Sequence, residues 1–327
     1  MMSNFGGKFS AFEKDFRKRF MPLAKRMTKL EKRINKLIVK AMSNAKLSTA
    51  YWNGLKREMN ILYKEMNVVF DLWAKKEIPA RYRRSIFQMQ KRIGANKLVL
   101  DKAKKTAIQV VKSTASNQIM RGLYTSSVES FLSASLTGRQ NLRNLFITTQ
   151  QTLVQESFVN VAVGTGFEMG DLRQAKSLLT SIFSSPAWEM VEQNRFVQAG
   201  KFKYKPSYYA ELVARTKFHQ ANSQAALVTA QNHDTDLMQV SSHNTSTKIC
   251  VPFEGKIFSI SGRDRRFPPL TDSPPFHPNC LHLDFPTFVS ALEVQGTLES
   301  FSAFSKDKIT RPPVPSGFVP AGERVLV

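Results

Sequence analysis

In the first third of the chain, apolar residues recur at steps of four and three, which is a period of about 3.5 residues. Such a period lines one narrow stripe of a helix, and a helix with this stripe needs a partner helix. The repeat runs twice, on either side of a polar break at Ser43-Asn44, and the short connection NAKLST joins the two runs. The pattern therefore predicts an antiparallel, coiled-coil-like helical hairpin. The first run is Phe12, Phe16, Phe20, Leu23, Met27, Leu30, Ile34 and Leu37, and the second is Trp52, Leu55, Met59, Leu62, Met66, Val69 and Trp73.

Two prolines fall in or beside these runs. Pro22 is expected to kink the first helix or to set its start after a short turn, because proline lacks a backbone N–H and fixes its own φ. Pro79 is expected to end the second helix for the same reason. The basic segment RYRRSIFQMQKRIG then follows it.

Positive charge is concentrated in the same part of the chain. The net charge is +23, and from Lys8 to Lys112 there are 28 lysines and arginines but only eight acids, whereas the rest of the chain has 20 bases and 17 acids. Because the apolar stripe forms the seam, the bases must occupy the outer helix faces. An excess of this size predicts a polyanionic neighbour, which is nucleic acid, a membrane surface or an acidic protein assembly.

An anion-binding role is favoured over a solvated hairpin whose charges bind nothing specific, because ordinary solvated helices interleave acids with bases. A membrane surface fits less well, since the aromatic residues lie in the seam and leave no separate apolar face for lipid. The candidate nucleic-acid-binding residues are Arg17, Lys18, Lys25, Arg26, Lys32, Arg33, Lys56, Arg57, Arg81, Arg83, Arg84, Lys91 and Arg92.

The remainder of the chain is predicted to form further helices and then a loop-rich region. Helices are expected over 101–136, over 139–163 and after Asp171. A further helix is expected from Pro206, because proline is tolerated in a first helical turn. Past Asn232, DLMQVSS and GKIFSIS predict short strands, FPTFVSALEVQ predicts a last helix, and the proline-rich tail from Lys306 predicts an extended strap or disorder. We therefore expect a mainly α protein with four parts. These are a basic helical arm (1–100), a helical middle region (101–204), a small α+β module (205–290) and a short helix with an extended tail (291–327).

Composition excludes several classes of protein. Hydrophobic residues make up 42% of the 327 residues, which excludes wholesale disorder. Two cysteines do not make a secreted disulfide scaffold, and they favour synthesis in a reducing, intracellular compartment. No stretch has the roughly 18 apolar residues of a membrane span, and the N-terminus has no apolar core of signal-peptide length. We therefore expect a soluble protein.

The stretch FHPNCLH, residues 276–282, brings together three side chains that can bind metals or do chemistry: His277, Cys280 and His282. The other cysteine, Cys250, lies 30 residues before Cys280, and His243 precedes it. One interpretation is a structural metal site, most simply zinc, held by both cysteines and two of the three histidines. A second is metal-free: the cysteines pack as small apolar residues or form a disulfide, while the histidines cap turns. A third makes Cys280 a nucleophile with a histidine base, although HPNCLH has no glycine-rich oxyanion turn beside it.

At this stretch the sequence also resembles a known family. The helix with ART and spaced alanines, the phrase QVSSH, the Cys followed by the run Phe-Glu-Gly-Lys, and the closing HPNC-x-H resemble the C-terminal module of tailed-phage minor capsid proteins. The resemblance is to the minor capsid protein 2 group, distant relatives of the Mu-type head-morphogenesis proteins, and it covers about residues 205–290. Leu281 stands where the relatives usually carry Arg, and Phe253 stands where the broader group often has the second Cys of a CxxC pair.

The resemblance implies a structural minor head protein of a tailed phage or phage-like particle, made in the host cytoplasm and kept in the virion. It implies a place at the portal vertex or the inner capsid wall, with the portal protein, the major capsid protein or both as partners. A basic arm inside such a particle would contact packaged double-stranded DNA without reading its sequence. We expect no membrane partner and no enzyme activity, because only 45 residues follow His282 and none of them forms an E-x-E motif. The alternative is a transient head-assembly factor or a cysteine- or metal-dependent processing enzyme.

Overall fold

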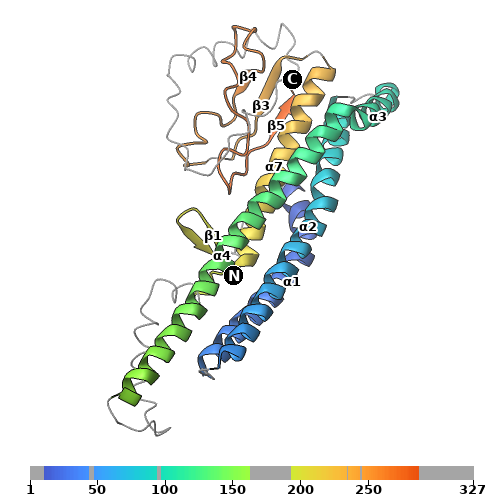
Figure 1. Cartoon of the computed structure of the whole chain (residues 1–327). Coiled ribbons are helices and arrows are strands. Elements are labelled where there is room, and N and C mark those ends of the chain that lie inside the picture. Colours follow the sequence, from blue (N-terminus) through green and yellow to red (C-terminus); the bar gives the residue numbers. More distant parts are fainter. Residues whose placement is uncertain are drawn as a thin grey trace. The chain divides into compact units, whose positions relative to one another are not determined.

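A computed structural model describes residues 11–43, 48–93, 97–162, 193–233, 235–243 and 245–286 of the protein. The helices are α1 (Ala11–Ser43), α2 (Thr49–Ile93), α3 (Lys97–Lys112), α4 (Thr114–Ala162) and α7 (Pro206–Asn232). The strands are β1 (Val197–Ala199), β2 (Phe202–Tyr204), β3 (Leu237–Val240), β4 (Ile257–Ser259) and β5 (Asp284–Pro286) (Figure 1). The predicted fold class, mainly α with short strands in the C-terminal region, is confirmed.

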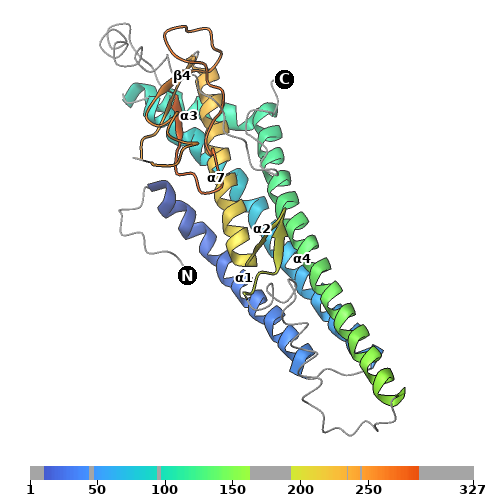
Figure 2. The ribbon, with the colours of Figure 1, turned by 90° about the vertical axis from the view of Figure 1, so that its left-hand side faces the viewer.

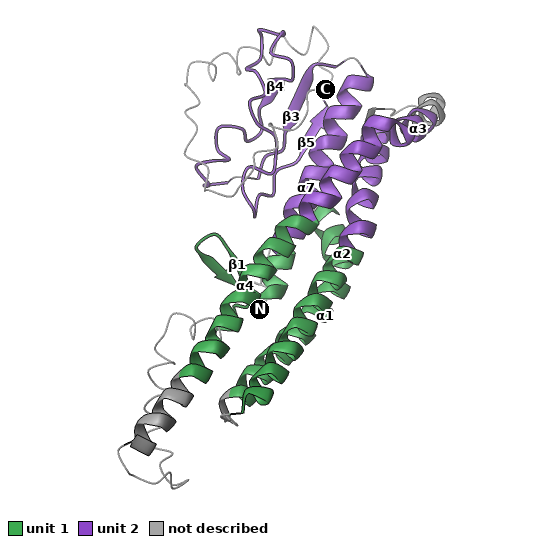
Figure 3. Ribbon diagram, viewed as in Figure 1, with its two compact units in different colours: residues 1–72, 128–211 green, residues 73–127, 212–327 purple. Residues whose placement is uncertain are grey.

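These elements form two compact units, each assembled from segments that are distant in the sequence (Figure 3). Unit 1 contains Met1–Leu72 and Val128–Glu211, and unit 2 contains Trp73–Ser127 and Leu212–Val327. The dividing points therefore fall inside α2, α4 and α7. The division into four consecutive parts stays a prediction.

In unit 1, α1 and the first part of α2 form the predicted antiparallel hairpin (Figures 1 and 2). Near the connection, the Tyr51 hydroxyl donates to the carbonyl of Lys40 at 2.9 Å. Further along, Arg33 Nη1 donates to Glu65 Oε2 at 2.7 Å. All eight apolar residues of the first run are buried, as the period predicts. Whether the pair also has coiled-coil geometry stays a prediction.

The buried face of α2 is wider than a two-helix seam requires, because α4 also packs against it. Phe70 stacks on Phe131 of α4 with ring centroids 4.3 Å apart, and the ring of Trp52 lies 6.1 Å from that of Phe146. Phe70 is fully buried, whereas Val69, which the 3.5-residue period placed in the seam, is only half-buried. The prediction for Val69 was therefore wrong, because a strict two-helix period cannot include the contact with a third helix.

The prediction that Pro79 ends the second helix was also wrong, because α2 continues through it to Ile93. Proline in a helix interior removes one hydrogen bond and costs about 3 kcal/mol. On both sides of Pro79 in unit 2, α2 buries large side chains, namely Trp73, Ile78, Tyr82 and Ile86. Burial of each such side chain contributes about 1.5–3 kcal/mol, which is enough together to offset the proline. Likewise α1 continues through Pro22.

The helices expected over 101–136 and 139–163 are divided at a different residue. The break lies at Ser113, and α4 then runs without interruption through Gly138 to Ala162. Ser113 Oγ accepts the N–H of Ser116 at 3.1 Å, which is the bond of a helix N-cap. A serine cap, rather than the glycine at 138, therefore sets the helix boundary.

Gly138 has a packing role instead, because the chain before β1 crosses α4 at this residue. A Cβ at position 138 would lie 2.0 Å from the carbonyl oxygen of Phe196. The same carbonyl accepts the Tyr63 hydroxyl at 2.6 Å, and both Tyr63 and Phe196 are buried. The antiparallel hairpin of β1 and β2, which pairs Val197 with Tyr204, follows directly and was not predicted.

In unit 2, the predicted strands over DLMQVSS and GKIFSIS are present as β3 and β4, and α7 begins at Pro206 as expected. Both β4 and β5 pair antiparallel with β3, so the sheet order is β4-β3-β5. The sheet and its loops lie against α7 (Figures 1 and 2): Ser223 Oγ donates to the carbonyl of Pro274 at 2.5 Å. β5 was not predicted. The helix expected after Asp171 and the tail from Lys306 lie outside the described residues, as does most of the helix expected over FPTFVSALEVQ.

Among the helices that the structure describes, none carries an apolar run long enough to cross a bilayer.

The contact at Gly138 yields a prediction about stability. We expect Gly138→Ala to lower the free energy of unfolding by about 1–3 kcal/mol, because the added methyl group meets a backbone carbonyl that is held in place. Gly122→Ala, in the same helix, is the matched control: nothing lies within 4 Å of its Cβ, and it should raise the stability by about 0.5–1 kcal/mol. Urea unfolding of both variants measures the difference. Equal stability of the two variants would contradict this description of α4.

Candidate functional site

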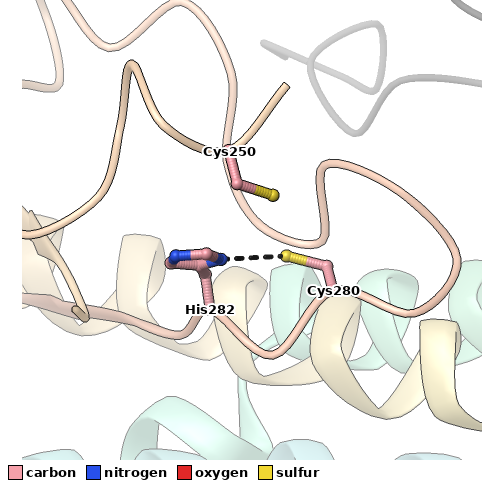
Figure 4. Close-up of side chains that lie close together, drawn as sticks. All are labelled: Cys250, Cys280 and His282. Atoms are coloured by element: carbon pink, nitrogen blue, oxygen red, sulfur yellow. Dashed lines mark hydrogen bonds between the residues drawn. The ribbon is translucent and has the colours of Figure 1, made fainter. Parts of the chain in front are cut away.

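Three of the predicted metal-binding residues converge in unit 2. Cys250 Sγ, Cys280 Sγ and a ring nitrogen of His282 all lie within 4.8 Å of one another, and the three side chains are buried (Figure 4). Cys280 Sγ and His282 Nδ1 are 3.4 Å apart. Both cysteines are free thiols. Within the part of the chain that the structure describes, these three side chains are the metal-binding donors that already lie close together.

Two turns bring the cysteines together. Around Cys250, its N–H donates to the carbonyl of Thr247 at 2.8 Å, and its own carbonyl accepts the N–H of Phe253 at 2.9 Å. In the second turn, the N–H of Cys280 donates to the carbonyl of His277 at 3.0 Å. Each cysteine is thus fixed by local backbone hydrogen bonds, and the two turns face each other (Figure 4).

Apolar side chains surround the cysteines and keep water from them. Val240, Phe253, Phe258 and Phe276 form one buried core with Cys250 and Cys280. The rings of Phe253 and Phe276 stack with centroids 4.3 Å apart. The cysteines therefore pack as members of the core, as the metal-free interpretation requires, and their sulfur atoms still face His282.

His282 is oriented by partners on both sides of its ring. Its Nδ1 faces Cys280, and its Nε2 lies 3.6 Å from Glu254 Oε1. Glu254 in turn accepts the N–H groups of His243 and Thr245. Sequence reasoning missed Glu254, although it stands four residues after Cys250 in the quoted Phe-Glu-Gly-Lys run.

The hydrogen bonds of the cluster polarise its ionisable groups. The Cys250 thiol donates to Cys280 Sγ, which lowers the pKa of Cys280 and raises that of Cys250. Burial opposes protonation of His282, but the interactions with Cys280 and Glu254 together outweigh it and raise the pKa of His282. A thiolate beside an imidazolium is the chemistry of a cysteine nucleophile. Cys280 is only 1% exposed, however, which gives a substrate no access to this sulfur in the structure.

The other two histidines predicted as metal ligands, His243 and His277, do not converge with the cysteines as His282 does. The ring of His243 meets that of His282 edge-on, with centroids 5.1 Å apart, and its Nε2 is 2.8 Å from Ser241 Oγ. The side chain of His277 is half-buried and lies outside the group of converging donors. The structure therefore places His243 beside the cluster and leaves His277 out of it.

The candidate nucleic-acid-binding bases are not equivalent in the structure. Arg81 is 3% exposed and its Nη2 donates to Asn222 Oδ1 at 2.9 Å, so it belongs to the interior of unit 2. Arg17 and Lys56 are half-buried, and they bond Glu13 and Gln150 respectively. Arg84 is also half-buried, and the side chain of Arg92 lies outside the described residues. The exposed members are Lys18, Lys25, Arg26, Lys32, Arg33, Arg57, Arg83 and Lys91, of which Arg33 pairs with Glu65.

On α1, the exposed lysines form a single face that sequence reasoning did not single out. Seven lysines share it, and all are exposed: Lys14, Lys18, Lys25, Lys29, Lys32, Lys36 and Lys40. At about 100° per residue they fall within an arc of about 80°, and they extend along about 39 Å of the helix. We call this set the lysine face. It lies on the side of α1 away from the buried apolar run.

The acids of α1 lie off the lysine face. Glu13 pairs with Arg17, and Asp15 pairs with Arg19 at 2.6 Å. Glu31 is buried and accepts the N–H of Ser207, and burial raises the pKa of its carboxyl. Within the described residues, none of these acids neutralises a lysine of the face. The face therefore presents a continuous strip of positive charge.

The contrast between Arg81 and Arg83 yields a second prediction. We expect Arg81→Met to lower the free energy of unfolding by about 1–3 kcal/mol, because Asn222 loses a buried charged donor. The neighbouring Arg83→Met removes an exposed base and should change stability by less than about 0.5 kcal/mol. Urea unfolding of both variants distinguishes the two roles. If Arg81→Met is as stable as the unmodified protein, Arg81 is not an interior residue.

Comparison with known proteins gives the family. The family described as phage minor capsid protein 2 matches residues 27–300, which include the second half of α1 and the whole cysteine–histidine cluster. No curated protein and no solved structure shows significant similarity to the chain. The match covers far more of the chain than the motifs of residues 205–290, and it confirms the resemblance that they indicated. The chain belongs to the phage minor capsid protein 2 family.

Proposed function

We propose that the protein is a structural minor head protein that contacts packaged double-stranded DNA through the lysine face of α1. We further propose that it lies at the portal vertex or on the inner capsid wall, with the portal protein or the major capsid protein as its protein partner. The observation that carries the DNA contact is the lysine face itself. It combines seven exposed lysines on one side of one helix with acids that are paired or buried elsewhere.

The dimensions and chemistry of this face suit a duplex. Its length of about 39 Å is close to one turn of B-DNA, which is about 34–36 Å. Each lysine placed near a phosphate releases condensed counterions, and this release favours binding without any contact to a base. Lysine is also a point charge on a flexible stem, so it tolerates variation in phosphate position but does not read sequence.

An acidic surface of a capsid or portal protein is the competing partner for the same face. Both partners are polyanionic, and both would bind less tightly as salt increases. They differ in that a duplex of any sequence suffices for the first, whereas the second needs one particular protein surface. Binding of the purified protein to unrelated duplexes therefore separates them.

A second function, that of a transient processing enzyme, has one observation in its favour, the pairing of Cys280 with His282. Burial of both side chains opposes it. Stoichiometry in finished particles separates the two functions, because a structural component is retained and a transient factor leaves. Retention of the chain in mature, DNA-filled particles supports the structural function.

A charge-neutralising variant tests the DNA contact. We expect the full-length triple variant Lys18→Gln, Lys25→Gln, Lys32→Gln to bind a duplex of arbitrary sequence much more weakly at 50 mM salt. The slope of log K against log salt should decrease by up to about three, since three phosphate contacts are lost. Fluorescence anisotropy over a range of salt concentrations measures both quantities.

A matched control removes the same charge elsewhere. Lys105, Lys201 and Lys248 are exposed lysines outside α1, and their replacement by Gln changes the net charge equally. This variant should retain nearly the slope of the unmodified protein. Equal loss of slope in both variants would mean that charge alone, rather than the lysine face, determines binding. No binding of the unmodified protein at low salt would reject DNA as the partner.

A further inference from the structure

We propose that the cysteine–histidine cluster is a zinc site, with Cys250, Cys280 and His282 as three ligands and His243 as the fourth. This inference is independent of DNA binding by the lysine face, because it rests only on residues of unit 2. It also selects among the three histidines of the region, which the sequence did not do.

The spacing of the donors fits one tetrahedral ion. Zinc binds sulfur at about 2.3 Å and imidazole nitrogen at about 2.0–2.1 Å, so two ligand atoms on one ion lie roughly 3.5–3.8 Å apart. Cys280 Sγ and His282 Nδ1 are 3.4 Å apart, and all three donors lie within 4.8 Å of one another. Small side-chain rotations are sufficient to bring the three atoms around one ion.

The position of His243 fits the fourth ligand. Two imidazoles on one tetrahedral zinc have ring centres roughly 5 Å apart. The rings of His243 and His282 are 5.1 Å apart and nearly perpendicular. Because Nε2 of His243 contacts Ser241 Oγ, its Nδ1 is the nitrogen left for a metal. Whereas the other three ligands are buried, His243 is exposed, so it would close the site from the solvent side.

Both histidines have the outer partners that metal-bound histidines usually have. A ligating imidazole typically directs its second nitrogen to a carboxylate, carbonyl or hydroxyl group, which fixes the ring. Nε2 of His282 faces Glu254, and Nε2 of His243 faces Ser241 Oγ. Glu254 also accepts the N–H of His243, so one carboxylate positions both ligands.

The donor set selects zinc among common ions. Two thiolates and two imidazoles are soft or borderline donors, which disfavour calcium and magnesium and favour zinc. The site also joins segments that bury little by themselves: β3, β4 and β5 have only three or four residues each. An ion held by residues 243, 250, 280 and 282 would therefore stabilise the loops that flank this small sheet.

Metal content and thiol reactivity test the proposal on the full-length protein. We expect protein purified under reducing conditions to contain one zinc ion per chain by elemental analysis. Because the chain has only two cysteines, any thiol reaction reports this site alone. Both thiols should be protected from alkylation in the native, zinc-loaded protein and become reactive when EDTA is added. In the cobalt-substituted protein, a thiolate-to-cobalt charge-transfer band and the intense visible bands of a tetrahedral ion are expected.

The zinc affinity of single variants distinguishes the proposed ligands from a nearby histidine that is not a ligand. Cys250→Ser, Cys280→Ser and His282→Gln should each lose at least about tenfold in zinc affinity. His277→Gln is the matched control in the same FHPNCLH stretch and should bind zinc normally. His243→Gln should weaken binding and alter the visible bands of cobalt. Unchanged bands in that variant would remove His243 from the ligand set.

The unmodified protein alone can overturn the proposal, even if a variant fails to fold. Reduced, folded protein that takes up neither zinc nor cobalt would exclude the site. A disulfide between Cys250 and Cys280 in protein isolated from the reducing cytoplasm would exclude it as well, and would support the alternative in which the sulfur atoms cross-link the two turns directly.

Discussion

The architecture of this protein depends on the two opposite faces of α1. Phe16, Met27 and Ile34 on one face are removed from water against the rest of unit 1, and burial of apolar surface is the main favourable term in folding. Ammonium groups cannot be buried without a partner, so the same periodicity that pairs α1 with α2 directs seven lysines to the opposite side. Packing and charge presentation are therefore two consequences of one pattern. The surface proposed to contact DNA is therefore exposed because the opposite, apolar face of α1 must be buried.

All eight apolar residues of the predicted run are buried in α1, although Ile38 and Ala41, which lie outside the run, are buried as well. In α2 the period failed at Val69, where a third helix takes part. A two-helix pattern predicts that Val69 is buried in the seam. The burial of Phe70 against Phe131 could be predicted only if the packing of α4 on α2 were already known. Pro79 shows how tertiary packing overrides a local rule, since burial of Ile78 and Tyr82 beside it outweighs the loss of one helical hydrogen bond. β1, β2 and β5 are three residues long, which is too short for an alternating pattern to be recognised. β4 is equally short, but it lies within the longer β-prone run GKIFSIS, and this run made it predictable.

For the sites, residue type was informative and spatial arrangement was not. The pair of cysteines and FHPNCLH indicated the cluster, but only the folded turns place His243 next to His282 and leave His277 outside. Glu254 could not be recognised as a partner of His282 before the two turns were brought together. The count of bases likewise showed which part of the chain is positively charged, but it could not distinguish exposed from buried bases. Lys25 is exposed, whereas Arg81 belongs to the wide buried face of α2.

The two candidate sites lie in different units: the lysine face is in unit 1, and the cysteine–histidine cluster is in unit 2 with the small sheet. Membership of the phage minor capsid protein 2 family places such a chain in a virion. The most direct test is a reconstruction of the intact, DNA-filled particle at a resolution that traces α1. The lysine face should lie against the density of the packaged genome. A lysine face that lies instead against a capsid or portal protein, with no DNA near it, would contradict the account.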